Sequence, residues 1–133
     1  MPRKPSPVPT DVELELLKLV WKLGEVTVRD ILEALPPERN LAYTTVMSMM
    51  RILEDKGYLT HRARDRAYVY RAQVSEDEVA RGMIRNLINK MFEGSPELLM
   101  VTLLETGNLT EEQLELLRRK VAEAKQVEGE ASS

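Results

Sequence analysis

The chain has 133 residues, of which 43% are hydrophobic and 31% are charged, as is typical of a globular domain or of a small domain with an appended segment. It contains no cysteine, which excludes disulfide frameworks, thiolate metal sites and cysteine nucleophiles. The net charge of −3 is unevenly distributed, because residues 1–74 carry 12 basic and 10 acidic side chains and residues 75–133 carry 7 and 12. Neither a signal peptide nor a membrane span is recognisable, so we expect a cytoplasmic protein.

The N-terminal part of the sequence predicts an irregular arm and then a helix. Residues 1–9 hold four of the seven prolines, a composition that is unsuited to regular structure. Thr10 followed by Glu13 is the pattern of a capping box and predicts the start of a helix. This first helix should continue to about Lys22 and end at Gly24.

Two further helices are predicted before the first strand. Thr27 is placed to cap a short second helix, which ends at Pro36 because proline disfavours the helical conformation in the residue before it. A third helix should run from about Leu41 to Lys56, with Gly57 in the left-handed conformation after it.

The third helix has two contrasting faces when its residues are spaced at about 100°. The apolar face, which should be buried, carries Ala42, Val46, Met49, Met50 and Leu53. The opposite face carries Tyr43, Thr44, Met47, Ser48 and Arg51. An ordinary solvated face would instead be rich in Glu and Lys, so this face indicates contact with a partner.

Residues 58–63 and 67–72 are predicted to form two strands of a hairpin around Arg64-Asp65-Arg66. A hairpin directly after a third helix is the wing of a winged helix-turn-helix. The predicted fold class is therefore mainly α with a small β-hairpin: a winged helix-turn-helix DNA-binding domain at residues 10–74, followed by a helical dimerisation region.

The remaining aromatic residues give no sign of catalysis. Trp21, Tyr68 and Tyr70 are assigned to the core rather than to ligand contacts. His61, the only histidine, has no cysteine or clustered carboxylate that would complete a metal site. Because a Gly-rich phosphate loop and a Ser/His/Asp pattern are also lacking, we predict neither an enzyme nor a bound cofactor.

Residues 75–126 are predicted to form the helical dimerisation region, and residues 127–133 a flexible tail. The stretch 98–104 is apolar almost all round, so a partner should cover it. An alternative is that these helices cap the winged helix of the same chain. The residues assigned to the dimer interface are Met83, Leu87, Met91, Leu98, Leu99, Val101, Leu103, Leu114, Leu117 and Val121.

The predicted order of elements favours binding to double-stranded operator DNA. The major groove admits one α-helix, whose short polar side chains can reach base edges, and wing arginines can neutralise phosphates or enter the minor groove. Two copies related by a two-fold axis would read a palindrome. The residues predicted to contact DNA are Tyr43, Thr44, Met47, Ser48, Arg51, Arg62, Arg64 and Arg66. The alternative function is a protein-interaction adaptor that does not bind DNA.

Three stretches, at residues 41–47, 51–59 and 68–70, resemble the penicillinase repressor (BlaI/MecI/CopY) family, and the resemblance extends over about residues 8–122. It implies a homodimeric transcriptional repressor whose third helices enter the major groove of a palindromic operator with TACA/TGTA-like half-sites. It also implies that DNA is read at or next to Tyr43, Thr44, Thr45 and Ser48.

The sequence departs from the family pattern at three points. Copper-responsive members end in a cysteine-rich motif, which this chain lacks, so copper sensing is not expected. Members that respond to β-lactams are cleaved at an Asn-Phe bond, where this chain has Thr102-Leu103. A regulatory protease acting here would therefore need a different preference. Ile52-Leu53 replaces the family's usual Arg-Leu, so the phosphate contacts should be arranged differently.

Overall fold

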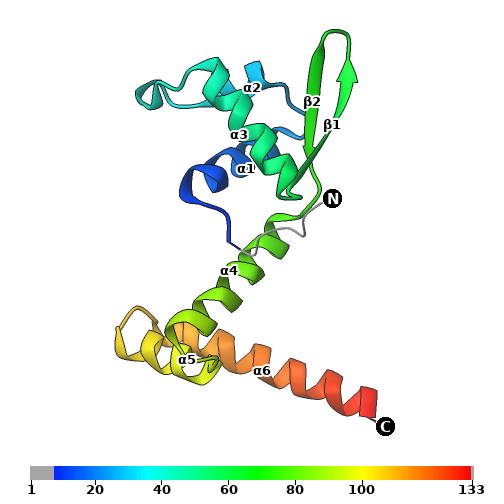
Figure 1. The fold of residues 1–133 in the computed structure, drawn as a ribbon. Coiled ribbons are helices and arrows are strands. Elements are labelled where there is room, and N and C mark those ends of the chain that lie inside the picture. Colours follow the sequence, from blue (N-terminus) through cyan, green and yellow to red (C-terminus); the bar gives the residue numbers. More distant parts are fainter. Residues whose placement is uncertain (1–7, 133) are drawn as a thin grey trace. The chain divides into compact units, whose positions relative to one another are not determined.

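The computed structural model describes residues 8–132, and their side chains up to residue 126. Figure 1 shows α1, α2 and α3 grouped together, with the hairpin of β1 and β2 projecting beside α3. The predicted mainly α content with one small β-hairpin is confirmed. In chain order the elements are α1 (Asp11–Leu23), α2 (Val28–Ala34), the short 3-10 helix η1 (Pro37–Arg39), α3 (Tyr43–Asp55), β1 (Leu59–Arg64), β2 (Ala67–Ala72), α4 (Glu76–Met91), α5 (Pro96–Glu105) and α6 (Glu111–Ser132).

The first two helices begin at the predicted capping boxes. At α1, the Glu13 backbone N–H donates to Thr10 Oγ1 at 3.2 Å, and the Thr10 backbone N–H donates to Glu13 Oε1 at 2.8 Å. Thr27 and Asp30 make the same reciprocal pair at α2. Gly24 follows the last residue of α1 as its C-cap and has a φ of 90°. Glycine adopts this conformation without the strain that a side chain would add.

The third helix begins slightly later than predicted. Its first residue is Tyr43, and Ala42 precedes it as an extended cap with a ψ of 153°. Ala42 is exposed, so its assignment to the buried face was wrong: a residue outside the helix does not follow the helical periodicity. At the other end, Gly57 has a φ of 90°, as the left-handed stop requires.

The two strands pair antiparallel around a turn in which Asp65 has a φ of 56°. Val26 extends this sheet by an isolated bridge to Tyr70. The Val26 N–H donates to the Tyr70 carbonyl at 2.9 Å, and the Tyr70 N–H donates back at 2.7 Å. The short extended segment between α1 and α2 therefore ties the base of the hairpin to the helices.

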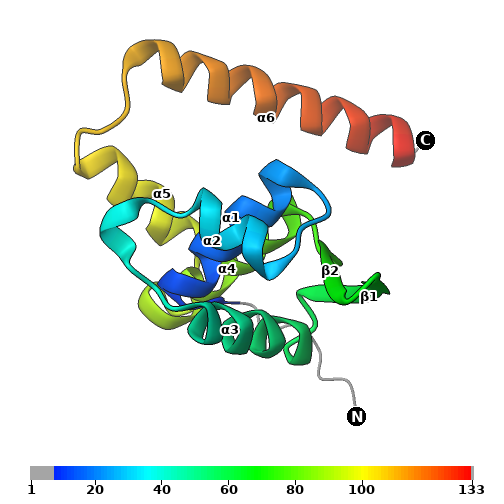
Figure 2. The ribbon, with the colours of Figure 1, turned by 90° about the horizontal axis from the view of Figure 1, so that it is seen from above.

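The core lies between α1, α2, α3 and the base of the hairpin, and Val79 of α4 packs into it. Figure 2 shows these helices and strands from a second direction. Each of these elements contributes apolar residues that are less than a tenth exposed. They are Leu16, Leu17, Val20, Val26, Val28, Ile31, Leu35, Val46, Met50, Leu53, Tyr58, Leu59, Tyr70 and Val79.

Two of the three aromatic residues that were assigned to the core lie in it or pack against it. Tyr70 is buried, and Trp21 packs against the core while its indole N–H donates to the Val74 carbonyl at 2.9 Å. Tyr68 is 49% exposed, so its assignment was wrong. Tyr68 pairs with Ala63 and is therefore nearer the turn than Tyr70, which pairs with His61. Figure 1 shows the turn end of the hairpin projecting beyond the helices.

The chain divides into two compact units between Leu87 and Ile88, which lies within α4 rather than before it. Most of α4 belongs to the first unit, because Val79 is buried in the winged-helix core and Met83 packs against it. Residues 1–7 of the predicted arm lie outside the described residues. No helix among those described is long and apolar enough to cross a membrane.

The C-terminal unit has capped helices but no buried side chain. Ser95 caps α5, and Thr110 and Gln113 cap α6 by reciprocal bonds of 3.1 and 2.9 Å. A flexible tail was predicted after residue 126, but the backbone of α6 continues to Ser132. The part of α6 before the predicted tail includes good helix formers and no proline. Between residues 88 and 126, none is buried.

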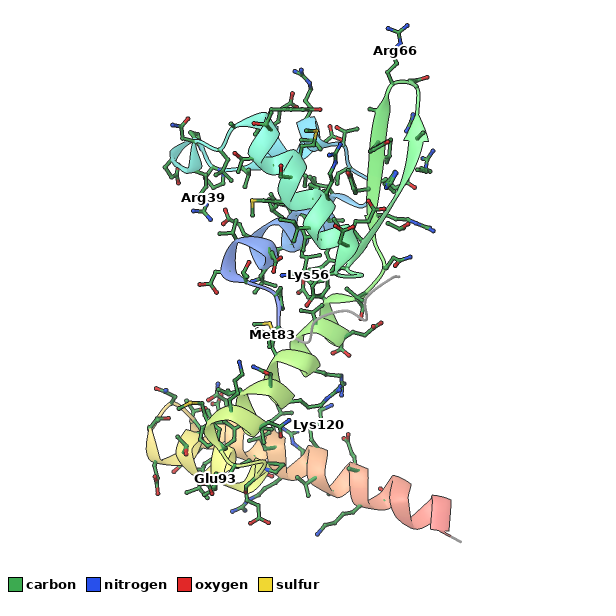
Figure 3. All side chains as sticks on the ribbon, viewed as in Figure 1. Arg39, Lys56, Arg66, Met83, Glu93 and Lys120 are labelled. Carbon is green, nitrogen blue, oxygen red and sulfur yellow. The ribbon has the colours of Figure 1, made fainter. Side chains whose placement is uncertain are left out.

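An ion pair joins the first helix of the winged-helix unit to the end of the third. Lys56 Nζ lies 2.7 Å from Glu13 Oε2 and 3.0 Å from Oε1 (Figure 3). Glu13 is only 5% exposed, and burial by itself raises the pKa of its carboxyl group. The hydrogen bonds from Lys56 and from the Thr10 backbone outweigh burial, so the pKa is lowered.

Replacing Lys56 by Met should lower the free energy of unfolding by about 1–3 kcal/mol near neutral pH, because the buried Glu13 carboxylate loses its cation. The lowered pKa means that this pairing stabilises the fold above the ordinary carboxyl value of 4.5 and is lost as the pH falls through the folded-state value. Denaturant unfolding at neutral and acidic pH measures both effects.

The exposed Lys22 on α1 offers a matched control, because Lys22→Met removes the same charge without breaking a buried pair. The deficit of Lys56→Met relative to this control should shrink in acid. A deficit that stayed constant with pH would show that Glu13 does not depend on Lys56.

Candidate nucleic-acid interface

Most residues inside α3 follow the predicted division into two faces. The exceptions are Met47 and Met49, which were predicted on opposite faces but are both half-buried and pack against the core. Val46, Met50 and Leu53 are completely buried. The side chains of Thr44 and Ser48, one helical turn apart, are exposed on the opposite face. Because packing against α1 and α2 occupies the apolar side, the hydroxyl groups are left facing solvent.

Around this hydroxyl face the other predicted contacts have different exposures. Thr45 and Arg51 are exposed, Tyr43 is 47% exposed and Met47 is half-buried. The last turn of α3, after Arg51, is less suited to an anionic partner, because Ile52 is 46% exposed there and Asp55 adds a negative charge.

The wing has two chemically different faces, since side chains of paired residues lie on the same side of a hairpin. His61, Tyr68 and Tyr70 share one face, and the His61 ring stacks on that of Tyr68 with centroids 4.2 Å apart. His61 Nδ1 lies 2.5 Å from a carboxylate oxygen of Glu54 in the last turn of α3. This face is therefore attached to the third helix.

The opposite face of the wing carries Arg62 and Arg64, and Arg66 lies in the turn. One of these three arginines has an internal partner. Arg62 Nη2 donates to Glu25 Oε2 at 2.8 Å, and this bond lowers the pKa of the Glu25 carboxyl group. Arg64 and Arg66 have no ion pair with any described residue. Figure 3 shows Arg66 extending outward from the turn.

A hollow of about 580 Å³ lies between α3, the start of α2 and the second strand of the wing. It brings together the predicted contacts Tyr43, Met47, Arg51 and Arg66. It also contains Arg29, which sequence reasoning missed because a single arginine in the first turn of an amphipathic helix is an ordinary solvated residue. The residues around it are Thr27, Val28, Arg29, Tyr43, Met47, Arg51, Arg66, Ala67, Tyr68 and Tyr70.

Comparison with known proteins identifies the family. The family model described as penicillinase repressor matches residues 9–123. The chain belongs to the penicillinase repressor family. The "Transcriptional regulator BlaI" of Mycobacterium tuberculosis is 34% identical over 115 residues, which cover 85% of this chain and 82% of that protein. The "Penicillinase repressor" of Bacillus licheniformis is 25% identical over 122 residues, or 92% and 95% of the two chains.

A solved structure of a penicillinase repressor family member supports the same fold. The solution structure of the DNA-binding domain of the repressor BlaI matches with a TM-score of 0.50 and 28% identity, over 56% of this chain and 92% of that one. The predicted family and the winged helix are thereby confirmed. The family consists of repressors rather than enzymes, and the comparisons do not favour the adaptor alternative.

The residues assigned to dimerisation have different surroundings. Met83 packs against the winged-helix core. The others are half-buried or exposed, Met91 most of all at 69%. Among described residues, no group of His, Cys, Asp or Glu could hold a metal ion.

The different partners of the wing arginines lead to a measurable prediction for DNA binding. Arg64→Ala should lower the slope of log affinity against log salt by about 0.9, the contribution of one phosphate contact. Arg62→Ala should lower it less, because phosphate must displace Glu25 from Arg62. Fluorescence anisotropy over a range of salt concentrations measures both slopes.

Glu25→Gln supplies the control for this comparison, since it removes the competing carboxylate and should strengthen DNA binding through Arg62. Equal losses of slope in Arg62→Ala and Arg64→Ala would contradict a competing role for Glu25.

Proposed function

We propose that the chain is a transcriptional repressor that binds palindromic operator DNA as a homodimer. The observation that carries the proposal is the exposed hydroxyl face of α3, at Thr44 and Ser48. Next to it is a wing in which Arg64 and Arg66 make no ion pair with a described residue. Repression would be steric: the bound protein blocks a promoter, and no covalent chemistry is involved.

The proposed base contacts follow from the dimensions of DNA. A helix fits into the major groove, where hydroxyl groups can bond base edges and apolar groups such as Met47 can touch thymine methyl groups. Thr44 and Ser48 project from the most exposed side of α3, so they are the proposed readers of sequence. Tyr43, Thr45 and Arg51 flank them and are proposed to contact the adjacent sugar and phosphate groups.

Homodimer formation is proposed because the C-terminal unit does not bury its own apolar side chains. Met100 is 54% exposed, Leu104 50% and Val121 50%. Contiguous exposed apolar surface is unfavourable in water and is typical of an interface. A second copy of the same unit would cover these residues and hold two winged helices for the two halves of a palindrome.

We also propose a cellular location and a regulatory partner for the repressor. The repressor would act in the cytoplasm, with a regulatory protease as a further partner. The Thr102-Leu103 bond lies within α5, where the Thr102 hydroxyl donates to the Leu98 carbonyl at 2.7 Å. A protease that cut there would need this part of α5 to unfold locally, because proteases bind extended chain.

Selection of duplexes from genomic fragments, followed by titration of the winning sequence, tests the proposal. A repressor making about six phosphate contacts should lose roughly 10³-fold in affinity between about 50 and 200 mM salt. A protein-interaction adaptor should select no sequence and bind no duplex at low salt.

Thr44→Ala should weaken binding to the selected duplex by about 1–3 kcal/mol and binding to a scrambled duplex much less. The reason is that a base contact contributes only where the matching base is present. Thr60→Ala removes the same methyl and hydroxyl groups from strand β1 of the wing instead of from α3. It should have little effect on binding to either duplex. Equal weakening on both duplexes would remove Thr44 from the base-reading set.

Leu103→Asp should convert the protein to monomers in sedimentation equilibrium, because dimerisation would bury an unpaired charge. Leu103 is 42% exposed on α5 and is one of the predicted interface residues. Asn108→Asp adds the same charge at an exposed polar position just after α5 and should leave the dimer intact. Persistence of the Leu103→Asp dimer would refute this interface.

A further inference from the structure

The hollow between α2, α3 and β2 collects positive charge from three separate elements. Arg29 comes from α2, Arg51 from α3 and Arg66 from the turn of the wing. None of the three has an ion pair with a described residue, although Arg39, Arg62 and Arg81 elsewhere do. Arginines from three elements that line one hollow without a carboxylate partner favour an anion as its occupant.

Two acidic groups close in the chain to Arg29 and Arg51 have other hydrogen-bond partners. The Asp30 carboxylate accepts the Thr27 backbone N–H at 2.9 Å as part of the α2 cap. The Glu54 carboxylate is bound by His61. Both carboxylates therefore make contacts that hold the fold. Neither they nor Asp65, which precedes Arg66, makes an ion pair with one of the three arginines.

The side of the hollow opposite α3 includes an exposed aromatic ring that is held in place. Tyr68 is 49% exposed and stacks on His61, which Glu54 anchors to α3. A ring fixed in this way loses little conformational freedom when it contacts a ligand, and its hydroxyl can donate to an anionic oxygen.

The position of the hollow relative to the hydroxyl face of α3 indicates which anion it would bind. Tyr43, Met47 and Arg51 recur every four residues and all line the hollow, whereas Thr44 and Ser48 lie on the adjoining stripe of α3. If that stripe enters the major groove, one strand of the backbone that borders the groove must pass between α3 and the wing.

We propose that the hollow is a phosphodiester-binding site that takes one strand of the DNA backbone, with Arg29 and Tyr68 as contact residues beside Arg51 and Arg66. This inference rests on the proposed DNA-binding function and adds to it a particular phosphate site and two residues outside the predicted contact set. Arg29 neutralises a phosphate from the side of α2, and Tyr68 packs against the neighbouring sugar.

The test combines variants of the full-length protein with chemically altered DNA. Arg29→Ala, Arg29→Lys and the control Arg85→Ala, an exposed arginine on α4, are titrated with the selected duplex over about 50–200 mM salt. Duplexes carrying a single neutral methylphosphonate, placed at each backbone position in turn, are then titrated with wild type and with Arg29→Ala. Thermal unfolding checks that each variant is folded.

Arg29→Ala should lower the salt slope by about 0.9, whereas Arg29→Lys and Arg85→Ala should keep the wild-type slope. At one backbone position per half-site, methylphosphonate should weaken wild type and leave Arg29→Ala unchanged. Tyr68→Ala should weaken binding and Tyr68→Phe should retain most of it, because packing on the sugar needs the ring.

Two failures can be told apart. A folded Arg29→Ala that keeps the wild-type slope and responds to every methylphosphonate as wild type does would overturn the phosphate site while leaving DNA binding intact. A wild-type protein that binds no duplex at low salt would overturn both this site and the proposed function.

Discussion

One buried carboxylate fixes the arrangement on which the candidate interface depends. Glu13 accepts the backbone N–H of Thr10 at the start of α1 and two contacts from Lys56 at the end of α3. These bonds set where α3 ends relative to α1, and the burial of Met50 and Leu53 sets its rotation. Buried contacts therefore determine both the translation and the rotation of α3. The hydroxyl face is held toward solvent by these contacts and not by bonds of its own hydroxyl groups.

Most of the fold could be predicted because its boundaries are encoded locally. Thr10 and Thr27 start helices by bonding residues three positions later, and Gly57 stops a helix by its own conformation. The boundary between the two units was less predictable: Val79 follows the cap of α4, and only the three-dimensional core shows that it packs with the winged helix. Local patterns therefore locate elements, and long-range packing decides which unit each joins.

The candidate interface was predictable on α3 and less so on the wing. A helix with a well-defined buried face has a well-defined exposed face, so Thr44 and Ser48 followed from periodicity alone. On the hairpin, Tyr68 and Tyr70 were both assigned to the core and do share one side, but burial depends on how far the helices extend beneath it. The bond between Arg62 and Glu25 joins residues far apart in the sequence, so no periodic pattern predicts it.

The distribution of ion pairs explains how an acidic chain can offer a cationic surface. Net charge counts every side chain equally, but an arginine bound to a carboxylate presents much less field to an approaching anion. Arg39 is paired with Glu15, whereas Arg29, Arg51 and Arg66 have no carboxylate partner among the described residues. These three meet at one hollow beside the hydroxyl face of α3. Since screening limits electrostatic attraction to about 8–10 Å at moderate salt, this local set of charges, rather than the total of −3, determines how a phosphate strand is received.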